Sequence, residues 1–189
     1  MVLNGGKMRT NVVITDDFYI NVDEVREFAL KQEFSLQANY PGKRTRTFIN
    51  DSTKELIQKI LFPLAGKVTK WNDVDGLTGS FQITTAEDRS WIHTDKFNSW
   101  AGVCYLTPDA PLSSGTGLFI NKQTQSFYED ESNINARDIT KWEMVDRIGN
   151  RYNRMILYRS DIYHSSLDYF GTDLYTGRLF QVFFINTEF

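Results

Sequence analysis

The stretch Arg178-Leu179-Phe180-Gln181-Val182-Phe183-Phe184-Ile185 decides the fold class. Successive side chains of a β-strand point to opposite faces, so Arg178, Phe180, Val182 and Phe184 share one face and the alternate residues share the other. Each face carries one polar residue among apolar ones, which indicates a strand buried on both sides. Because a guanidinium out of water needs a carboxylate or phosphate partner, we expect Arg178 to have one, and a ligand is a candidate for it.

Four further runs of apolar or aromatic residues, of strand length and separated by turn residues, precede this strand. They are residues 77–84, 100–106, 117–121 and 155–158. Phe, Tyr and Trp make up 14% of the chain and gather in its second half among β-branched neighbours, as is typical of strands. The second half is therefore predicted to be a set of short strands.

Two helices are predicted before these strands. Asn21, with an acidic residue three positions later, is a candidate capping box for a helix over residues 22–34. A second candidate capping box, begun by Ser52, opens a run of apolar residues at helical spacing that Pro63 ends or kinks. Helices followed by strands fit an α+β, mainly β chain in which the helices brace one face of a jelly-roll or barrel-like sheet pair.

The size and composition indicate one domain. The chain has 189 residues, of which 41% are hydrophobic, enough for a substantial core. It contains no linker, internal repeat or low-complexity segment. We expect a single domain over residues 1–189, with helical support over about 1–75 and a jelly-roll core over about 76–189.

Charge and cysteine content limit the partners and the compartment. The 21 Lys and Arg against 24 Asp and Glu give a net charge of −3, which disfavours nucleic acid as a partner. The single cysteine, Cys104, excludes an internal disulfide and is expected to be a small buried residue, so a reducing cytoplasm is the expected location. No run of 18 apolar residues occurs, so neither a membrane span nor secretion is expected. The oligomeric state stays open.

Both histidines of the chain lie in contexts that suit a metal site. His93 opens His93-Thr94-Asp95, and in a strand the side chains of His93 and Asp95 point to the same face. His164 follows a predicted strand 71 positions later, and a neighbouring strand could deliver it as a third ligand. Two imidazoles and one carboxylate form a facial triad, which leaves three positions open on a ferrous ion. A structural or surface role for each lone histidine is the alternative.

Five segments between about Ser80 and Phe184 form an ordered pattern. They are Ser90-Trp91-Ile92-His93-Thr94-Asp95, Val103-Cys104-Tyr105-Leu106-Thr107-Pro108, Gly115-Thr116-Gly117-Leu118, the segment from Met155 to His164, and Gly177-Arg178-Leu179-Phe180. In this order they resemble the Fe(II)/2-oxoglutarate-dependent dioxygenase superfamily, and within it the prolyl-4-hydroxylase-like branch. The resemblance implies an α+β, mainly β fold: a double-stranded β-helix (jelly-roll, cupin-like) with N-terminal bracing helices.

The resemblance implies a role for each matching residue. His93, Asp95 and His164 would hold Fe(II), and Arg178 would pair with the distal carboxylate of 2-oxoglutarate. Tyr105 is the candidate donor of a second hydrogen bond to that carboxylate, because Phe180 stands where many members have Ser. Two further departures are the 14 positions between His164 and Arg178, where about ten are usual, and the Gly-Thr-Gly turn in place of Gly-Gly.

The resemblance also implies a reaction. 2-Oxoglutarate and O2 would hydroxylate an unactivated C–H bond and give succinate and CO2. The presence of Asp95 favours hydroxylation over halogen transfer. Phe184 stands where nucleic-acid demethylating relatives carry a second Arg, so repair of DNA or RNA is not expected. The expected substrate is a peptidyl proline, a free amino acid or a small metabolite, selected by loops 35–50 and 121–143. Within the first loop, Lys43-Arg44-Thr45-Arg46 is expected to be solvated; the alternative is that it lies over the site mouth and meets an acidic substrate.

Two other classes of function fit the same sequence. One is a cupin-type jelly-roll protein that binds a small molecule without turning it over, which turnover of 2-oxoglutarate would exclude. The other is an interaction domain or a structural jelly roll, in which His93 and His164 would lie far apart.

Overall fold

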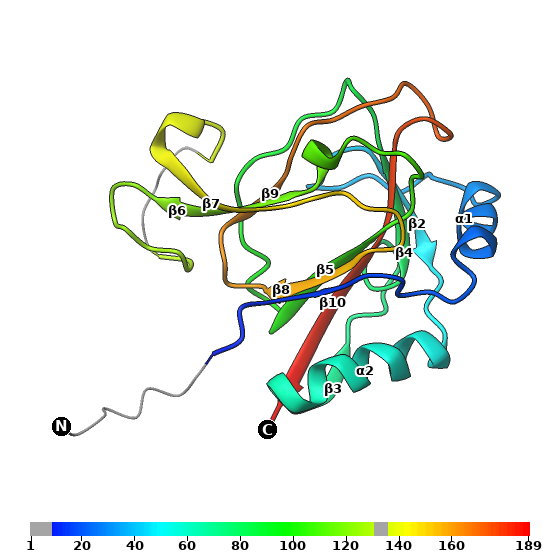
Figure 1. Ribbon diagram of the computed structural model, residues 1–189, viewed down its shortest axis with the longest axis horizontal. Coiled ribbons are helices and arrows are strands. Elements are labelled where there is room, and N and C mark those ends of the chain that lie inside the picture. The colour runs from blue at the N-terminus through cyan, green and yellow to red at the C-terminus, as the bar shows by residue number, and fades with distance from the viewer. Residues whose placement is uncertain (1–8, 131–135) are drawn as a thin grey trace.

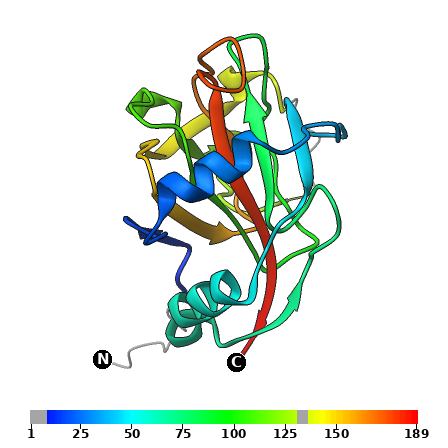
Figure 2. The same ribbon diagram turned by 90° about the vertical axis from the view of Figure 1, so that its right-hand side faces the viewer.

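Two antiparallel sheets and two helices make up the fold in a computed structural model that describes residues 9–130 and 136–189. The sheets lie face to face, and both helices cover the outer face of the larger sheet (Figures 1 and 2). This mainly-β arrangement is a double-stranded β-helix with bracing helices, as the sequence predicted. None of the helices in the described ranges is long and apolar enough to span a bilayer.

The larger sheet has seven strands. Its spatial order is β1-β8-β5-β10-β4-β2, and β3 pairs with the last residues of β10. The bounds are β1 Val12–Thr15, β2 Lys43–Thr47, β3 Lys67–Trp71, β4 Ser80–Thr84, β5 Trp100–Tyr105, β8 Met155–Arg159 and β10 Arg178–Glu188. The central position of β10, the red strand of Figure 1, explains why its sequence is apolar on both faces.

The smaller sheet has three strands in the order β7-β6-β9. Their bounds are β6 Thr116–Asn121, β7 Trp142–Ile148 and β9 His164–Ser166, with short 3-10 turns η1 Leu112–Ser114 and η2 Ile139–Lys141 before β6 and β7. A single bridge between His93 and His164 extends this sheet beyond β9. The smaller sheet thus faces the inner side of β10 and β5 and closes a space between the two sheets.

The two faces of β10 pack into two different cores, as the alternation predicted. Leu179, Phe183 and Ile185 belong to the core under the helices, where Cys104 is also fully buried. The alternate residues Phe180, Val182 and Phe184 belong to the core between the sheets. Arg178 begins the inner face and is only 1% exposed.

Helix α1 spans Val22–Leu30, so the prediction of a helix to residue 34 was too long. The chain leaves the helix because Leu36 exchanges both backbone hydrogen bonds with Arg44. The predicted capping box is also wrong in detail, since the Asn21 side chain caps no backbone N–H and instead donates to Glu24. Pairing of Leu36 with a residue of β2, eight positions later, has ended the helix earlier than its helical periodicity indicates.

Helix α2 spans Asp51–Ala65 and begins before the predicted capping box. Its N-cap is Asn50, whose side chain accepts a hydrogen bond of 2.8 Å from the backbone N–H of Thr53. Pro63 lies inside the last turn, and the helix ends two residues later at Ala65; Gly66, which follows, has a φ of +79°. Ile57 and Leu61 are fully buried on the helix face that covers the larger sheet.

The prediction of a solvated loop at Lys43-Arg44-Thr45-Arg46 is wrong. These residues belong to β2, which pairs with β4 at the edge of the larger sheet. Arg44 and Thr45 are buried, whereas Lys43 and Arg46 are exposed. The strand carries no apolar residue, so the alternation that marks strands in a sequence is absent from it.

Candidate active site

The backbone brings the two histidines together. His93 and His164 form an antiparallel bridge in which each backbone N–H donates to the other residue's carbonyl, at 3.0 and 2.9 Å. Side chains of such a pair project to the same face, and the ring centroids are 4.4 Å apart. The backbone N–H of Asp95 donates to the carbonyl of Ser160 at 2.7 Å, which fixes the third residue beside them. This proximity contradicts the structural jelly roll with distant histidines.

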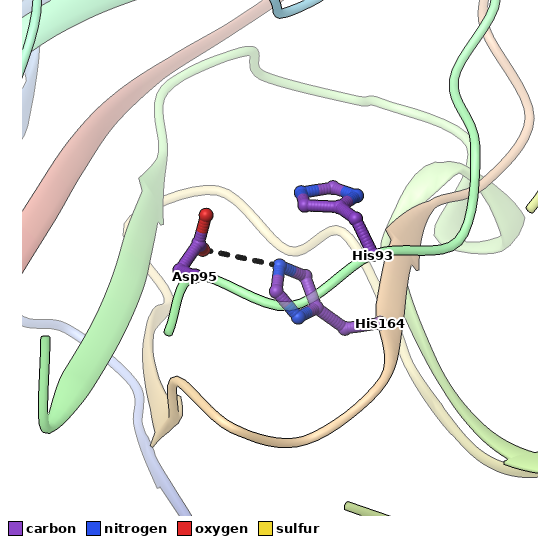
Figure 3. Close-up of side chains that lie close together, drawn as sticks. All are labelled: His93, Asp95 and His164. Atoms are coloured by element: carbon purple, nitrogen blue, oxygen red, sulfur yellow. Dashed lines mark ion pairs between the residues drawn. The ribbon is translucent and has the colours of Figure 1, made fainter. Parts of the chain in front are cut away.

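The three side chains converge on one point (Figure 3). Their candidate ligand atoms all lie within 4.8 Å of one another. Asp95 Oδ2 is 3.3 Å from His164 Nε2. The predicted set of His93, Asp95 and His164 therefore has the composition and the spacing of a two-histidine, one-carboxylate metal site.

Hydrogen bonds to the backbone set which ring nitrogen faces this point. His93 Nδ1 donates to the carbonyl of Trp91 at 2.9 Å, and His164 Nδ1 donates to the carbonyl of Ile162 at 2.9 Å. A carbonyl only accepts, so Nδ1 of each ring carries a proton, and in the neutral form of either ring Nε2 carries a lone pair. Such bonds are the usual support of metal-binding imidazoles. In His164 that lone pair faces a carboxylate oxygen, an arrangement that a cation between them stabilises.

The protonation states at the site also suit a cation. Burial and the neighbouring His164 ring lower the pKa of His93 to about 4, so its ring is neutral at pH 7. Burial disfavours the charged form of Asp95, but His164 in its protonated form, as a hydrogen-bond donor and a positive charge, outweighs burial and lowers the pKa of that carboxyl. Neutral imidazole and ionised carboxylate are the forms that bind metals.

All three side chains line one cavity between the sheets. Its walls come from β2, β4, β5, β8 and β10 of the larger sheet, from β6 and β9 of the smaller sheet, and from the segments before β2 and before β5. Besides the three candidate ligands, the lining residues include Asn39, Tyr40, Pro41, Arg44, Gln82, Thr116, Arg178, Phe180, Val182 and Phe184.

Arg178 lies in the wall of this cavity with an unused donor. Its Nε donates to the carbonyl of Ser114 at 2.8 Å and its Nη2 to that of Gly115 at 3.4 Å. Its Cζ lies 4.3 Å from the centroid of the Phe180 ring. Nη1 is buried and has no hydrogen-bond partner in the described part of the chain, and no described carboxylate pairs with Arg178. A buried guanidinium in this state fits an anionic ligand.

Tyr105 lies beside Arg178 but reaches the cavity through another residue. Its hydroxyl is 2.8 Å from Thr116 Oγ1, and its ring centroid is 5.3 Å from Arg178 Cζ. Tyr105 is fully buried, whereas Thr116 lines the cavity. The role of Tyr105 toward a ligand stays a prediction. Thr116 is a site residue that the sequence reasoning missed, although it fills the middle of the Gly-Thr-Gly turn.

The two loops expected to select a substrate contribute differently. From residues 35–50, Asn39, Tyr40, Pro41 and Arg44 line the cavity. In the second loop, residues 131–135 lie outside the described residues. Of the remaining residues of 121–143, none lines the cavity. Arg44 belongs to the segment for which the sequence offered a position over the site mouth as the alternative, and it lines the cavity from a strand rather than from a loop. Gln82 is a further wall residue that the sequence reasoning did not identify.

Comparison with solved structures identifies the fold. HygX from Streptomyces hygroscopicus, with nickel, 2-oxoglutarate and hygromycin B bound, has a TM-score of 0.62 at 10% identity over 95% of this chain and 84% of that chain. SnoN, a non-heme alpha ketoglutarate dependent epimerase from nogalamycin biosynthesis, has a TM-score of 0.58 at 14% identity over 93% and 79%. A prolyl hydroxylase from Trichoplax adhaerens, in complex with a hypoxia inducible factor oxygen degradation domain peptide fragment, has a TM-score of 0.54 at 11% identity over 93% and 84%.

The protein therefore has the fold of the Fe(II)/2-oxoglutarate-dependent dioxygenases, with a candidate metal triad. A family model described as "Family of unknown function (DUF6445)" matches residues 1–141, and the chain belongs to this family. The matched segment includes His93 and Asp95 and ends before His164 and Arg178. Comparison with curated proteins finds no match.

Proposed function

We propose that this protein is an Fe(II)- and 2-oxoglutarate-dependent oxygenase that hydroxylates a C–H bond. One observation carries the proposal: a single cavity is lined both by His93, Asp95 and His164 and by Arg178, a buried guanidinium with an unused donor. A metal site and an anion site on the walls of one cavity suit a ligand that binds both.

The residues present fit the metal. His93 and His164 offer one lone pair each, and Asp95 offers a carboxylate with a lowered pKa. Three protein ligands leave coordination positions open for a co-substrate and for O2. These three residues would hold Fe(II) in the proposed enzyme.

The residues present also fit 2-oxoglutarate. Arg178 would bind the distal carboxylate through Nη1, and Thr116 offers a hydroxyl on the same part of the wall. Phe180 and Val182 line the cavity on the strand that begins with Arg178. Their side chains would cover the aliphatic part of the co-substrate and exclude water from the charged pair.

The bound iron and 2-oxoglutarate would supply the oxidising power, because the oxidative decarboxylation of 2-oxoglutarate to succinate by O2 accompanies insertion of one oxygen atom into a substrate C–H bond. The chain's own residues position the reactants. The carbonyls of Trp91 and Ile162 hold the two imidazoles in the tautomer that binds metal. The substrate would be a peptidyl proline, a free amino acid or a small metabolite.

Turnover of 2-oxoglutarate tests this proposal. Protein freed of metal and then given Fe(II), 2-oxoglutarate and O2 is expected to produce succinate and CO2 even without a substrate, and to stop when a chelator is added. Asp95→Asn is expected to abolish succinate formation, whereas Asp146→Asn, at an exposed position on β7, is the matched control. If wild type binds 2-oxoglutarate and forms no succinate, the protein is a cupin-type binding protein.

A further inference from the structure

Arg44 is a second buried cation in the wall of the cavity. It lies on β2 and is 7% exposed. Phe180 of β10 pairs with Gln82 of β4, and Gln82 pairs with Arg44. Residues in register on neighbouring strands share a face of the sheet, and all three line the cavity. The guanidinium therefore belongs to the same inner wall as Arg178, on the strands toward the sheet edge.

The partners of Arg44 are all uncharged. Its Nε donates to Gln82 Oε1 at 2.8 Å and its Nη1 to the carbonyl of Gly76 at 2.7 Å. Its Cζ lies 3.9 Å from the centroid of the Tyr40 ring. Within residues 9–130 and 136–189 no carboxylate forms an ion pair with it, and Nη2 makes no hydrogen bond. Burying a cation with neutral partners alone is costly.

This inference rests on the proposed oxygenase. In its site, no negative charge is left over to balance the positive charge of Arg44. With Fe(II) and doubly negative 2-oxoglutarate bound, the charges of the metal, the co-substrate, Asp95 and Arg178 cancel. Arg44 adds one positive charge to the same cavity. Burial lowers the pKa of Arg44 to about 10, with Tyr40 and Asp95 opposing that change, so the guanidinium remains charged at neutral pH.

We propose that Arg44 is the specificity-determining residue of the oxygenase and binds a carboxylate group of the substrate. The substrate class is a small carboxylic acid with an apolar body. The apolar body would lie against Val182 and Phe184, which line the same cavity, and the Phe184 ring centroid is 5.6 Å from Arg44 Cζ. A guanidinium on this wall prefers a carboxylate to a neutral amide because the carboxylate adds an opposite charge in a buried site and offers two acceptor oxygens to the N–H donors.

The test compares acids with amides on loaded protein. Straight-chain carboxylic acids from acetate to octanoate, and their primary amides, are titrated by calorimetry into anaerobic protein that holds Fe(II) and 2-oxoglutarate. The visible charge-transfer band of the iron-bound 2-oxo acid shows throughout that the co-substrate stays in place. We expect the longer acids to bind about tenfold or more tightly than the matching amides.

Two variants assign that preference to one residue. Arg44→Gln is expected to reduce acid binding to the level of the amides, with the affinity for 2-oxoglutarate unchanged. Arg26→Gln is the matched control, because Arg26 also donates to two carbonyls, those of Leu106 and Tyr175, and does not line the cavity. The comparison of acids with amides in wild type needs no variant, so it tests for a substrate-carboxylate site even if Arg44→Gln does not fold.

Each other outcome overturns the inference. Equal binding of acids and amides, or no binding of any acid, means that the cavity has no substrate-carboxylate site. Loss of the band in Arg44→Gln protein that thermal unfolding shows to be folded means that Arg44 belongs to the co-substrate site. Displacement of 2-oxoglutarate by the acids means that they bind at Arg178. If wild type shows no band at all, the proposed oxygenase itself fails, which is a separate result.

Discussion

His93 and His164 exchange both backbone hydrogen bonds, although 71 positions separate them in the chain. The bridge extends the smaller sheet by one residue pair and places both imidazoles on one face. A slip of one residue in this pairing would turn one ring to the opposite face. The metal site is therefore built by closure of the sheet rather than by a local motif alone.

Removal of the Arg178 guanidinium is expected to weaken 2-oxoglutarate binding and to leave metal binding intact. A hydrogen bond to a charged group is worth about 1.5 to 3 kcal/mol, so Arg178→Gln should raise the Kd by about 10- to 150-fold. The measurement is an anaerobic titration of Fe(II)-loaded protein with 2-oxoglutarate, with Arg26→Gln as control. An unchanged Kd would show that another group holds the distal carboxylate.

The hydroxyls of Tyr105 and Thr116 are expected to act as a pair. Thr116 lines the cavity and Tyr105 contacts its hydroxyl, so Thr116→Val should weaken 2-oxoglutarate binding more than Tyr105→Phe does. The double variant should lose less affinity than the two single losses combined, because both changes break the same hydrogen bond. Kd values for the four proteins test this. A larger loss in Tyr105→Phe would give Tyr105 the direct role that the family resemblance implies.

Helix α2 offers a stability test with an internal control. Asn50→Ala should lower the free energy of unfolding by about 1 kcal/mol, because the Asn50 side chain caps the backbone N–H of Thr53. Ser52→Ala removes a hydroxyl from an exposed position and should change it by less than about 0.5 kcal/mol. Urea unfolding of both variants measures the difference. The reverse order would restore Ser52 as the cap.

The carboxyl group of Asp16 is expected to make the free energy of unfolding depend on pH in the acid range. Its carboxylate accepts hydrogen bonds from Arg154 at 2.6 and 3.0 Å and from Arg151 at 2.8 Å, and these arginines lower its pKa. Because the pKa of this carboxyl is lower in the folded than in the unfolded state, its ionised form stabilises the fold at pH values above the ordinary carboxyl pKa. The stabilisation is lost as the pH falls through the pKa of the folded state. Asp16→Asn should therefore be less stable than wild type at neutral pH, and the gap should close in acid. A gap that stays constant in thermal melts down to about pH 2 would contradict this.

The sequence predicted features that depend on short-range patterns. The two faces of β10 followed from alternation over eight residues. The convergence of His93 and Asp95 was predicted from their spacing in a strand, whereas the structure has only a single bridge at His93. The meeting of these two residues with His164 needed the order of motifs that the family resemblance supplied. Many short strands preceded by helices predicted a jelly-roll or barrel-like sheet pair, and the family resemblance specified the double-stranded β-helix.

The features that the sequence did not predict depend on pairing between distant segments. Arg44 is buried because β2 pairs with β4, yet Lys43-Arg44-Thr45-Arg46 has the composition of a solvated loop. The end of α1 also depends on strand pairing, because Leu36 exchanges both backbone hydrogen bonds with Arg44 of β2. Asn50 and Ser52 are both good N-caps, so only the direction of the incoming chain decides between them.

The most direct test of the account is an anaerobic titration of metal-free protein with Fe(II) and then 2-oxoglutarate, in wild type and in His164→Ala. The account predicts a weak visible metal-to-ligand charge-transfer band in wild type and none in His164→Ala, since His164 is one of three ligands that lie within 4.8 Å of one another. Thermal unfolding of both proteins checks that the variant is folded. A wild-type protein that binds neither Fe(II) nor 2-oxoglutarate would contradict the account.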